Sequence, residues 1–412
     1  MQISSPPPSQ ANIFLYGPSG SGKSTTGRAL AANLNQDFLD VDELIETRSG
    51  MTIPEIFARE GETGFREREK QALQRALAAG GKVVALGGGA LTTPENRTWV
   101  QAAGEVVLLN AHLETLLSRL QKDSLERPLL TRSPGTGGSS RDHLRDLLAR
   151  RGEHYASFPL QVDTDGKTPA QVAWAIQRRL GRFHLRGMAS RKHPGYDVRV
   201  QPGGLDRLGL ALQASGMKGP VAVVSDENVA GFYLSRVIES LTEAGYPAKE
   251  ITIPAGEAHK TLETLSTLWK AFLDAKIERG STVVALGGGV VGDLAGFAAA
   301  THLRGVPWVV VPTSLLAMVD SSLGGKTGAD LPQGKNLIGA FHPPRLVLAD
   351  PQVLVTLPAV EFVNGMAEVL KHGIIADPEL YANCRRQLGI PDPAGRYKLV
   401  ARGMAVKVKI IE

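Results

Sequence analysis

A glycine-rich segment near the start of the chain has the residue types and spacing of a phosphate-binding loop. Residues 17–25 read Gly-Pro-Ser-Gly-Ser-Gly-Lys-Ser-Thr and fit the pattern G-x-x-x-x-G-K-[ST] at every position. The apolar run 13–16 is typical of a strand, and residues 26–34 are typical of a helix. In that setting backbone N–H groups close around phosphates, Lys23 reaches the terminal phosphates and Ser24 holds Mg²⁺. The segment predicts a nucleoside triphosphate site, and its context disfavours a glycine turn that binds nothing.

Two aspartates follow the next predicted strand. Asp40 and Asp42 come after the strand 37–39 and precede a helix that we expect to open at Glu43. One carboxylate can serve Mg²⁺, and the other can accept a hydrogen bond from a substrate hydroxyl. Acidic residues are also common as helix caps, so this pair alone leaves both interpretations open.

Arginines and a second glycine turn complete the candidate chemistry of the first half. Arg66 lies in a charged helical stretch, where a surface position is the simpler interpretation. The turn 87–89 is Gly-Gly-Gly, which lets backbone approach a ligand closely. Arg127 and Arg151 flank the glycine- and serine-rich loop 131–140, whose length suits a lid over phosphates.

Taken together, these motifs resemble the shikimate kinase family over about residues 11–180. The resemblance is carried by the phosphate loop, the Asp-x-Asp pair, Phe-Arg at 65–66, Gly-Gly-Gly at 87–89, Arg-Pro-Leu-Leu at 127–130 and Arg-x-x-x-Tyr at 151–155. It implies a P-loop α/β domain with a parallel sheet that phosphorylates the 3-hydroxyl of shikimate with ATP and Mg²⁺.

The family's roles carry over onto the matching positions. ATP binding falls on Gly20, Ser21, Gly22, Lys23, Ser24, Thr25 and Arg127. Shikimate binding falls on Asp42, Arg66, Gly88 and Arg151, and Mg²⁺ on Ser24 and Asp40. Lys23, Asp42 and Arg127 carry the catalysis, with Asp42 orienting the attacking hydroxyl. A gluconate- or nucleoside-monophosphate-type kinase is the alternative, which leaves the spacing of Asp42, Arg66 and Gly88 unexplained.

The elements that must position these groups are βα units. Short β-branched runs end in glycine turns and alternate with helical patterns, which is typical of parallel sheets. The heptapeptide Val-Val-Ala-Leu-Gly-Gly-Gly occurs at both 83–89 and 283–289. We interpret each copy as a buried strand whose carboxyl end faces a ligand.

The second half carries a different set of candidate groups. They are the strand 221–226 with its terminal aspartate, the segment 256–260, the glycine turn 287–293, and the polar clusters at 312–314, 320–327, 334–336 and 368–373. The glycine turn suits the pyrophosphate of a dinucleotide. Three lysines beside Gly or Asn in apolar surroundings, Lys326, Lys335 and Lys371, are not typical of surface and with Arg304 would bind a phosphate or carboxylate.

This second set resembles the 3-dehydroquinate synthase family from about Tyr196 onward. The resemblance implies a Rossmann-like domain that binds NAD, followed by an α-helical domain that holds Zn²⁺ or Co²⁺. The positions that would contact NAD are Asp226, Glu257, Lys260, Gly289, Val290, Val291, Gly292, Asp293, Thr313, Ser314 and Lys335. Those that would contact the substrate, 3-deoxy-D-arabino-heptulosonate 7-phosphate, are Arg304, Asp320, Lys326, Asn336 and Lys371.

The metal site implied by the resemblance is incomplete within residues 1–412. Glu368 matches the first zinc ligand, but the family's Gly-His-x-x-Gly-His segment and later histidine have no counterpart here. His302, His342 and His372 lie outside that motif. We therefore expect an unfinished helical domain with an exposed apolar face and an inactive synthase half in this chain.

Two alternatives remain for the second half. It is either a non-catalytic binding or dimerisation module attached to a monofunctional kinase, or an NAD-dependent polyol dehydrogenase of similar fold. Lys326 and the pair Lys335–Asn336 argue against the dehydrogenase, because a neutral polyol needs no anion clamp.

Length and composition set the outer limits. With 412 residues we expect a disordered lead 1–10, a kinase domain 11–180, a linker 181–195, an NAD-binding domain 196–350 and a helical domain 351–412. A net charge of +5 without a basic stripe disfavours nucleic acid, and no apolar run is long enough to cross a membrane. The single cysteine, Cys384, excludes an internal disulfide and fits the cytoplasm. The resemblance adds an expected homodimer through the synthase half.

Overall fold

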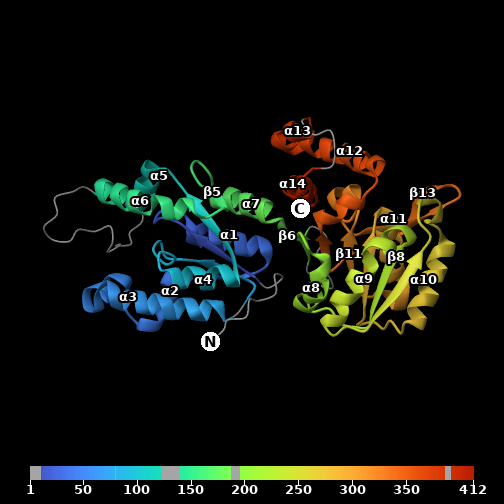
Figure 1. The fold of residues 1–412 in the computed structure, drawn as a ribbon, viewed down its shortest axis with the longest axis horizontal. Coiled ribbons are helices and arrows are strands. Elements are labelled where there is room, and N and C mark those ends of the chain that lie inside the picture. Colours follow the sequence, from blue (N-terminus) through green and yellow to red (C-terminus); the bar gives the residue numbers. More distant parts are fainter. Residues whose placement is uncertain (1–10, 79, 123–139, 187–194, 386–390) are drawn as a thin grey trace. The chain divides into compact units, whose positions relative to one another are not determined.

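The structure, a computed structural model, describes residues 11–78, 80–122, 140–186, 195–385 and 391–412. The chain divides into two compact units, Met1–Gln177 and Arg178–Glu412 (Figure 1). Among the described residues, no helix combines the length and hydropathy that a membrane span requires.

The first unit is built on a parallel sheet of five strands. Their order across the sheet is β2-β3-β1-β4-β5, and every neighbouring pair is parallel. The strands are β1 (Asn12–Tyr16), β2 (Asp37–Asp40), β3 (Lys82–Ala85), β4 (Gly104–Asn110) and β5 (Gln161–Asp163). The central strand β1 is buried along its whole length, as its apolar sequence predicts for a strand inside a parallel sheet.

Helices connect these strands in the βα order that the sequence predicts. They are α1 (Lys23–Leu34), α2 (Val41–Ser49), α3 (Ile53–Leu77), α4 (Pro94–Ala103), α5 (Leu113–Lys122), α6 (Ser140–Ala156) and α7 (Pro169–Leu180). A capping box between Thr52 and Glu55 starts α3, and Gly61 kinks that helix with a φ of 68°. On the C-terminal side of this kink, Phe65, Leu73 and Ala76 face the core. The charged side of α3, which carries Arg66, therefore faces away from that core.

The second unit contains a seven-stranded sheet with the order β6-β7-β14-β11-β10-β8-β9. All pairs are parallel except β6 with β7. The strands are β6 (Arg182–Leu185), β7 (Tyr196–Val200), β8 (Val221–Asp226), β9 (Ala248–Ile253), β10 (Thr282–Gly287), β11 (Trp308–Pro312) and β14 (Leu346–Ala349). A separate antiparallel hairpin joins β12 (Lys326–Leu331) and β13 (Gly334–Phe341).

The helices of the second unit fall into two groups. Those that connect the strands are α8 (Leu208–Ala214), α9 (Glu227–Glu243), α10 (Leu262–Asp274) and α11 (Gly289–Thr301). After the 3₁₀ segment η6 (Pro351–Thr356) come the helices α12 (Ala359–Ala376), α13 (Pro378–Arg385) and α14 (Pro393–Ile411). The π-helical turn η5 (Ala317–Ser321) packs against both α12 and α14.

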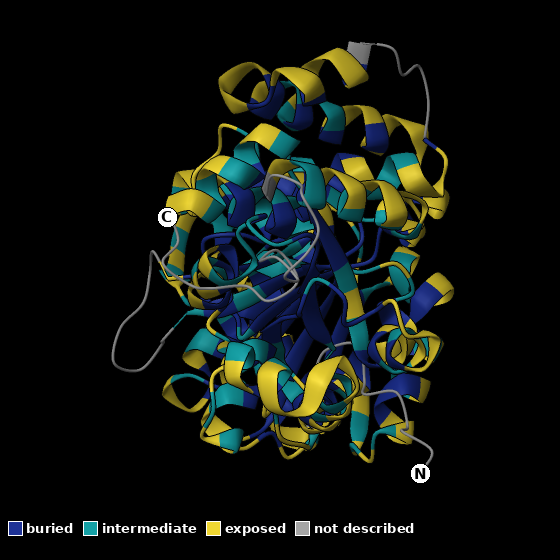
Figure 2. Ribbon diagram, turned by 90° about the vertical axis from the view of Figure 1, so that its left-hand side faces the viewer, coloured by how far each residue is buried: buried dark blue, intermediate teal, exposed yellow. Residues whose placement is uncertain are grey.

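Burial follows the predicted pattern of α/β layers. Figure 2 shows the strands as buried and the surrounding helices as exposed on their outer sides. Both copies of the heptapeptide form a buried strand, β3 or β10, that runs into a glycine turn. The α/β fold class predicted for both halves is therefore confirmed, including the helical stretch at the end.

One segment differs from its predicted form. Residues 182–185, which we placed in a linker, form β6 and pair antiparallel with β7. Phe183 and Leu185 alternate with exposed or half-buried neighbours and are buried, so this short stretch has the period-2 pattern of an edge strand. The rest of the basic segment, 187–194, lies outside the described residues.

Candidate active sites

The phosphate loop lies between β1 and α1, as predicted. Gly17, Gly20 and Gly22 adopt φ values of 140°, 82° and 88°, a region that favours glycine. Lys23, the first residue of α1, folds its side chain back and donates from Nζ to the carbonyl oxygens of Gly17 and Pro18 at 2.9 and 3.0 Å. Its ammonium group therefore lies over the loop at a helix N-terminus, where anions are favoured.

Ser24 and Asp40 are in direct contact beside this loop. Ser24 Oγ donates to Asp40 Oδ2 at 2.6 Å, while Asp40 Oδ1 accepts from the Asp42 backbone N–H at 3.0 Å and so caps α2. Capping by one oxygen of Asp40 therefore does not exclude the site interpretation, because the other oxygen contacts Ser24. Asp42 Oδ1 lies 3.2 Å from where a Cβ on Gly87 would stand, which places its carboxylate against the glycine turn.

The two arginines predicted for substrate binding meet at the same glycine turn. A Cβ on Gly89 would lie 2.8 Å from Arg66 Nη2 and 3.2 Å from Arg151 Nη2. Arg151 also donates from Nη1 to the Gly88 carbonyl oxygen at 2.8 Å. Two converging guanidinium groups form a site for a carboxylate or phosphate. The structure thus gathers Asp42, Arg66, Gly88 and Arg151, which are far apart in the sequence.

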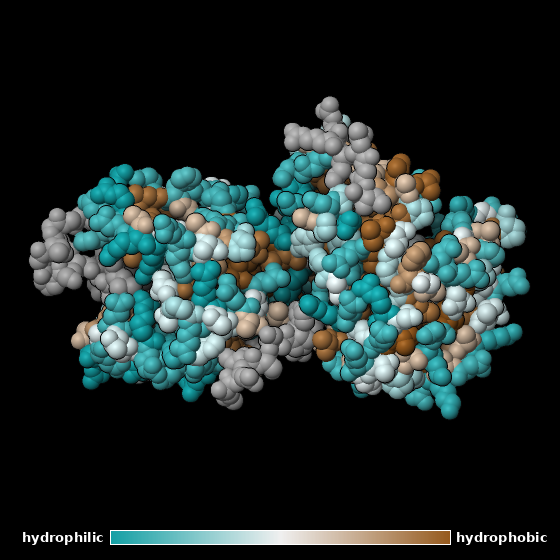
Figure 3. Space-filling view, in the orientation of Figure 1, coloured by the Kyte–Doolittle hydropathy of each residue, from teal (hydrophilic) through white to brown (hydrophobic). Residues whose placement is uncertain are grey.

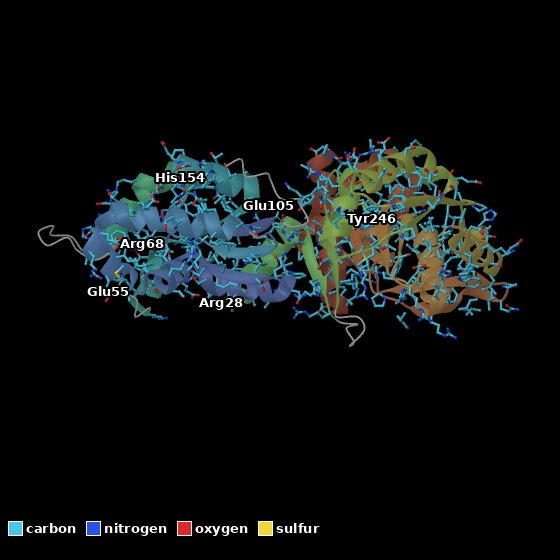
Figure 4. All side chains as sticks on the ribbon, turned by 90° about the horizontal axis from the view of Figure 1, so that it is seen from below. Arg28, Glu55, Arg68, Glu105, His154 and Tyr246 are labelled. Carbon is cyan, nitrogen blue, oxygen red and sulfur yellow. The ribbon has the colours of Figure 1, made fainter. Side chains whose placement is uncertain are left out.

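Two tyrosines and a histidine support this turn. Tyr155 and Tyr16 donate to the Gly88 carbonyl oxygen at 3.0 and 3.3 Å. Tyr16 Oη also lies 3.0 Å from His154 Nε2, on the helix α6 that carries Arg151 (His154 is labelled in Figure 4). Burial raises the pKa of Tyr16 and lowers the pKa of His154, and nearby guanidinium groups lower the His154 pKa further. We predicted no role for Tyr16 or His154.

Two other side chains were also missed. Glu69, 1 % exposed, accepts from Arg66 Nη1 at 2.7 Å; burial raises the pKa of Glu69, and the Arg66 charge opposes that rise. The i, i+3 spacing on a helix was the available signal for this pair. Arg119 donates to the carbonyl oxygens of Gly20 and Thr164 at 3.3 and 2.8 Å, so it fixes the phosphate loop from α5. No motif marked Arg119, and Arg127 lies outside the described residues.

In the second unit the repeated glycine turn leads directly into a helix. β10 ends at Gly287, and the predicted NAD residues Gly289, Val290, Val291 and Gly292 form the first turn of α11. The Thr313 N–H donates to the Gly287 carbonyl oxygen at 2.9 Å, and Ser314 Oγ lies 3.6 Å from where a Cβ on Gly288 would stand. A small cavity beside this turn is lined by Gly289, Gly292, Ser321 and Lys326, among others.

The buried Lys260 joins two other predicted residues. Lys260 is 4 % exposed, and its Nζ lies 2.5 Å from Asp293 Oδ2 and contacts the Asn336 side-chain oxygen. Burial raises the pKa of Asp293, and the Lys260 charge opposes that rise. Nearby, Lys335 Nζ lies 3.1 Å from Glu257 Oε1. Residues predicted to bind NAD and residues predicted to bind substrate therefore belong to one network.

Asp226 has a local structural role at its predicted position. It ends β8 and caps α9, because its Oδ1 accepts from the backbone N–H groups of Asn228 and Val229, each at 3.0 Å. Helix capping therefore accounts for an aspartate at this position without a bound ribose. A ribose hydroxyl would have to bind the second carboxylate oxygen of Asp226.

The expectation that the lysines are withdrawn from the surface is wrong. Lys326, Lys335 and Lys371 are all exposed. They extend from the hairpin and from α12, where polar strand and helix faces leave long side chains in water. Arg304 is exposed in a left-handed turn with a φ of 67°, and among the described residues it makes no direct polar contact with the other predicted substrate residues.

Two other possible metal ligands lie beside Glu368, which the sequence did not indicate. Asp320 on η5 and His372 on α12 place ligand atoms together with a Glu368 oxygen, all within 4.8 Å of one another. Glu368 and His372 are one helical turn apart and therefore share a face of α12. One nitrogen and two oxygen donors suit a divalent transition metal, so these residues fit the kind of ion that the resemblance implies.

Comparison with known proteins agrees with this division. Residues 19–181 match the family described as shikimate kinase, and residues 250–364 match the one described as 3-dehydroquinate synthase N-terminal. A 3-dehydroquinate synthase of Rippkaea orientalis is 51% identical over 189 residues, covering 46% of this chain and 52% of that protein. The synthase of Gloeobacter violaceus is 48% identical over 218 residues, covering 52% of this chain and 60% of that protein. The chain thus spans about half the length of these curated relatives.

Solved structures resemble each half. A 2-deoxy-scyllo-inosose synthase is 26% identical with a TM-score of 0.51, covering 56% of this chain and 64% of that one. A shikimate kinase from Acinetobacter baumannii, solved with shikimate, is 39% identical with a TM-score of 0.38, covering 41% of this chain and 92% of that one. Residues 19–181 thus match the shikimate kinase family and residues 250–364 the N-terminal part of the 3-dehydroquinate synthase family, within one chain.

Proposed function

We propose that the first unit transfers the terminal phosphoryl group of ATP to the 3-hydroxyl of shikimate. One observation carries this proposal: the arginine-lined glycine turn lies against the phosphate loop. A Cβ on Gly88 would lie 3.3 Å from the Gly17 carbonyl oxygen and 3.6 Å from the Ser19 nitrogen. An anion held by Arg66 and Arg151 is thus next to a bound triphosphate.

Each residue has a role in that transfer. Lys23 and the loop N–H groups bind the triphosphate, and Arg66 and Arg151 bind the shikimate carboxylate. Asp42 accepts the hydrogen bond of the attacking hydroxyl and orients it. Mg²⁺, held by Ser24 and Asp40, would neutralise charge on the phosphates. Catalysis then consists mainly of positioning and charge stabilisation.

The purified 412-residue chain tests this activity directly. We expect ADP formation that depends on shikimate, with phosphate found on its 3-hydroxyl. Gluconate and nucleoside monophosphates serve as competing acceptors. Phosphorylation of either in preference to shikimate would contradict the assignment.

For the second unit we propose NAD binding and conversion of 3-deoxy-D-arabino-heptulosonate 7-phosphate to 3-dehydroquinate. The glycine turn at the start of α11 and the network of Lys260, Asp293 and Asn336 support a dinucleotide beside an anionic substrate. The first turn of α11 with Lys260 and Asp293 would hold NAD, which would supply reversible hydride transfer at the substrate alcohol. A bound divalent metal would act as Lewis acid on that alcohol.

A second candidate is a dimerisation module, which one observation favours. Val360, Val363, Ile374 and Ile375 of α12 are between 57% and 72% exposed. Their spacing puts an apolar stripe on one side of the helix, and Figure 3 shows hydrophobic residues at the surface in this region. Such a face is typical of an interface, here with a second copy of the chain.

Two measurements separate these candidates. Phosphate release from the heptulosonate phosphate in the presence of NAD and Zn²⁺ would establish the synthase. No phosphate release, together with a dimer in sedimentation experiments that Val363→Glu converts to a monomer, would establish the module. The kinase assay on the same sample shows that the chain is intact in both cases.

A further inference from the structure

A chain of hydrogen bonds leads from helix α6 to the glycine turn of the proposed shikimate site. His154 of α6, labelled in Figure 4, places Nε2 3.0 Å from Tyr16 Oη, and Tyr16 donates to the Gly88 carbonyl oxygen at 3.3 Å. Tyr16 is the last residue of β1 and directly precedes the phosphate loop. The chain therefore connects three segments that are distant in sequence: β1, the turn after β3, and α6.

The hydroxyl group of Tyr16 has one hydrogen and two neighbours. Because that hydrogen is donated to Gly88, Oη is left to accept, and His154 must supply the hydrogen of the other contact from Nε2. Burial raises the pKa of Tyr16, so the hydroxyl stays protonated. Tyr16 is 0 % exposed, and a buried hydroxyl that loses a partner has no bulk water to replace it.

Aromatic neighbours fix the direction of the His154 ring. It meets the Tyr16 ring edge to face at 89° with centroids 5.7 Å apart, and the Phe158 ring at 81° and 5.3 Å. Phe158 is buried, and Arg97 Cζ lies 4.5 Å from the centre of its ring. Burial, and then the charges of Arg97 and Arg151, lower the pKa of His154. The ring is therefore neutral at about pH 8, where it carries a single N–H.

Three donors share the carbonyl oxygen of Gly88. Arg151 Nη1 lies at 2.8 Å, Tyr155 Oη at 3.0 Å and Tyr16 Oη at 3.3 Å. Arg151 and Tyr155 both belong to α6, whereas Tyr16 belongs to β1. Of these three donors, Tyr16 is thus the one that ties the turn to the strand before the phosphate loop. A shift of the turn would change where the Arg151 guanidinium stands relative to Gly89.

We propose that His154 is a positioning residue for shikimate and that it acts through Tyr16. Its Nε2–H holds the Tyr16 hydroxyl in the orientation that donates to Gly88, and the position of that turn sets where Arg151 meets the shikimate carboxylate. The effect on shikimate rests on the proposed kinase function, whereas the hydrogen-bond chain rests on geometry alone. Since Arg151 binds the acceptor substrate, the KM for shikimate should respond to His154 and the KM for ATP should not.

Steady-state kinetics of the 412-residue chain test the effect on shikimate. Tyr16→Phe and His154→Leu should each raise the KM for shikimate roughly 3–10-fold, the effect of one lost buried hydrogen bond, with the KM for ATP nearly unchanged. His154→Gln should stay near the wild-type value, because its amide nitrogen can donate from about the position of the imidazole Nε2. The combined Tyr16→Phe and His154→Leu variant should be no worse than Tyr16→Phe alone. Far-ultraviolet circular dichroism shows whether each variant is folded.

Tyr155→Phe is the matched control. It removes another hydroxyl from the same carbonyl oxygen, but that hydroxyl bonds to Gly88 and not to His154. In the Tyr155→Phe background, His154→Leu should therefore still raise the KM for shikimate by its full factor. Additive effects of His154→Leu and Tyr16→Phe, or a KM in His154→Gln as high as in His154→Leu, would overturn the proposal, because His154 would then act by packing alone.

Imidazole ¹⁵N chemical shifts test the hydrogen-bond chain without a kinase assay. At about pH 8 the His154 signal, identified by its absence in His154→Gln, should show the Nε2–H tautomer, and Tyr16→Phe should remove that preference. The Nδ1–H tautomer in the wild-type protein would mean that Tyr16 donates to His154 instead, and would overturn the proposal. The Nε2–H tautomer in a chain that forms no ADP with shikimate would support the hydrogen-bond chain and contradict the proposed function, so the two failures are distinguishable.

Discussion

Arg151 donates a hydrogen bond of 2.8 Å from Nη1 to the carbonyl oxygen of Gly88. This contact ties helix α6 to the turn after β3 and fixes the guanidinium that faces Gly89. Tyr155 and Tyr16 donate to the same oxygen, so a single carbonyl group holds the substrate-side arginine, its helix and the strand before the phosphate loop. Geometry at one turn thus links both halves of the kinase site.

Gly89→Ala should weaken shikimate binding without destabilising the fold. Gly89 does not adopt a positive φ, so the backbone accepts alanine, but its methyl group would lie within 3.2 Å of both guanidinium groups and displace them. We expect a raised KM for shikimate and little change in KM for ATP or in thermal stability. Steady-state kinetics and thermal unfolding check this.

Gly152→Ala is the matched control for that substitution. Gly152 is exposed in α6, next to Arg151 in sequence, and nothing lies within 4 Å of where its Cβ would stand. Alanine should stabilise the helix by about 0.5–1 kcal/mol and leave kinetics unchanged. A KM effect of the control as large as that of Gly89→Ala would contradict the steric argument.

Asp42→Asn tests the proposed orientation of the hydroxyl. The substitution keeps the size of the side chain and removes its charge, so kcat should fall by about 10²–10⁴-fold, as for loss of a general base. Lys23→Ala should also abolish turnover, but through loss of charge at the phosphates. Both variants should unfold at the wild-type temperature. Near-normal turnover in either would exclude the assigned role of that residue.

The lowered pKa of His154 predicts how the stability of the first unit depends on pH. Its pKa is lowered in the folded state, so the unfolded chain binds a proton at a higher pH than the folded one. The free energy of unfolding should therefore fall as pH drops through the ordinary histidine range near 6.5 and level off below the folded pKa. Glu69, whose pKa is raised, acts in the opposite direction at lower pH.

Calorimetric scans between pH 5.5 and 8 measure this effect. The unfolding transition of the first unit is the one whose midpoint temperature rises when shikimate and nucleotide are added. His154→Gln should flatten the pH dependence of that transition. An identical slope in His154→Gln and wild type would show that His154 is not the group responsible.

The pair Lys260–Asp293 should be mutually dependent. Removing one partner leaves a buried or half-buried charge, so Lys260→Met should cost up to about 3–5 kcal/mol, the range for a broken buried pair. Asp293→Asn combined with Lys260→Met should cost less than the sum of the two single changes. Denaturant unfolding of the four proteins gives the coupling energy; additive costs would mean that the pair is not coupled.

Much of the first site could be predicted from local sequence. The phosphate loop, its strand and its helix are contiguous, and their geometry follows from glycine φ values and an apolar strand. The aspartate pair was predicted as either a cap or a site, and Asp40 serves as both a cap and the partner of Ser24. The α/β class was equally readable, because β-branched runs and glycine turns alternate along the chain.

Contacts between distant segments were decided by the tertiary structure. Tyr16 and His154 are separated by 138 positions, and no local pattern joins them. His372 lies outside any histidine motif, yet folding places it beside Asp320 and Glu368. The exposure of Lys326, Lys335 and Lys371 was misjudged for a related reason, since burial depends on which elements cover a side chain.

The sequence alone therefore determined the parts whose geometry comes from neighbouring residues: the loop that binds phosphate, the βα units and the order of the two units. Only the tertiary structure decided which side chains converge on the Gly88 turn, which lysine is buried with Asp293, and which two side chains lie beside Glu368. Convergence follows from the parallel packing of strands and the docking of α12 and α14, and these depend on interactions across the whole unit rather than on any single segment.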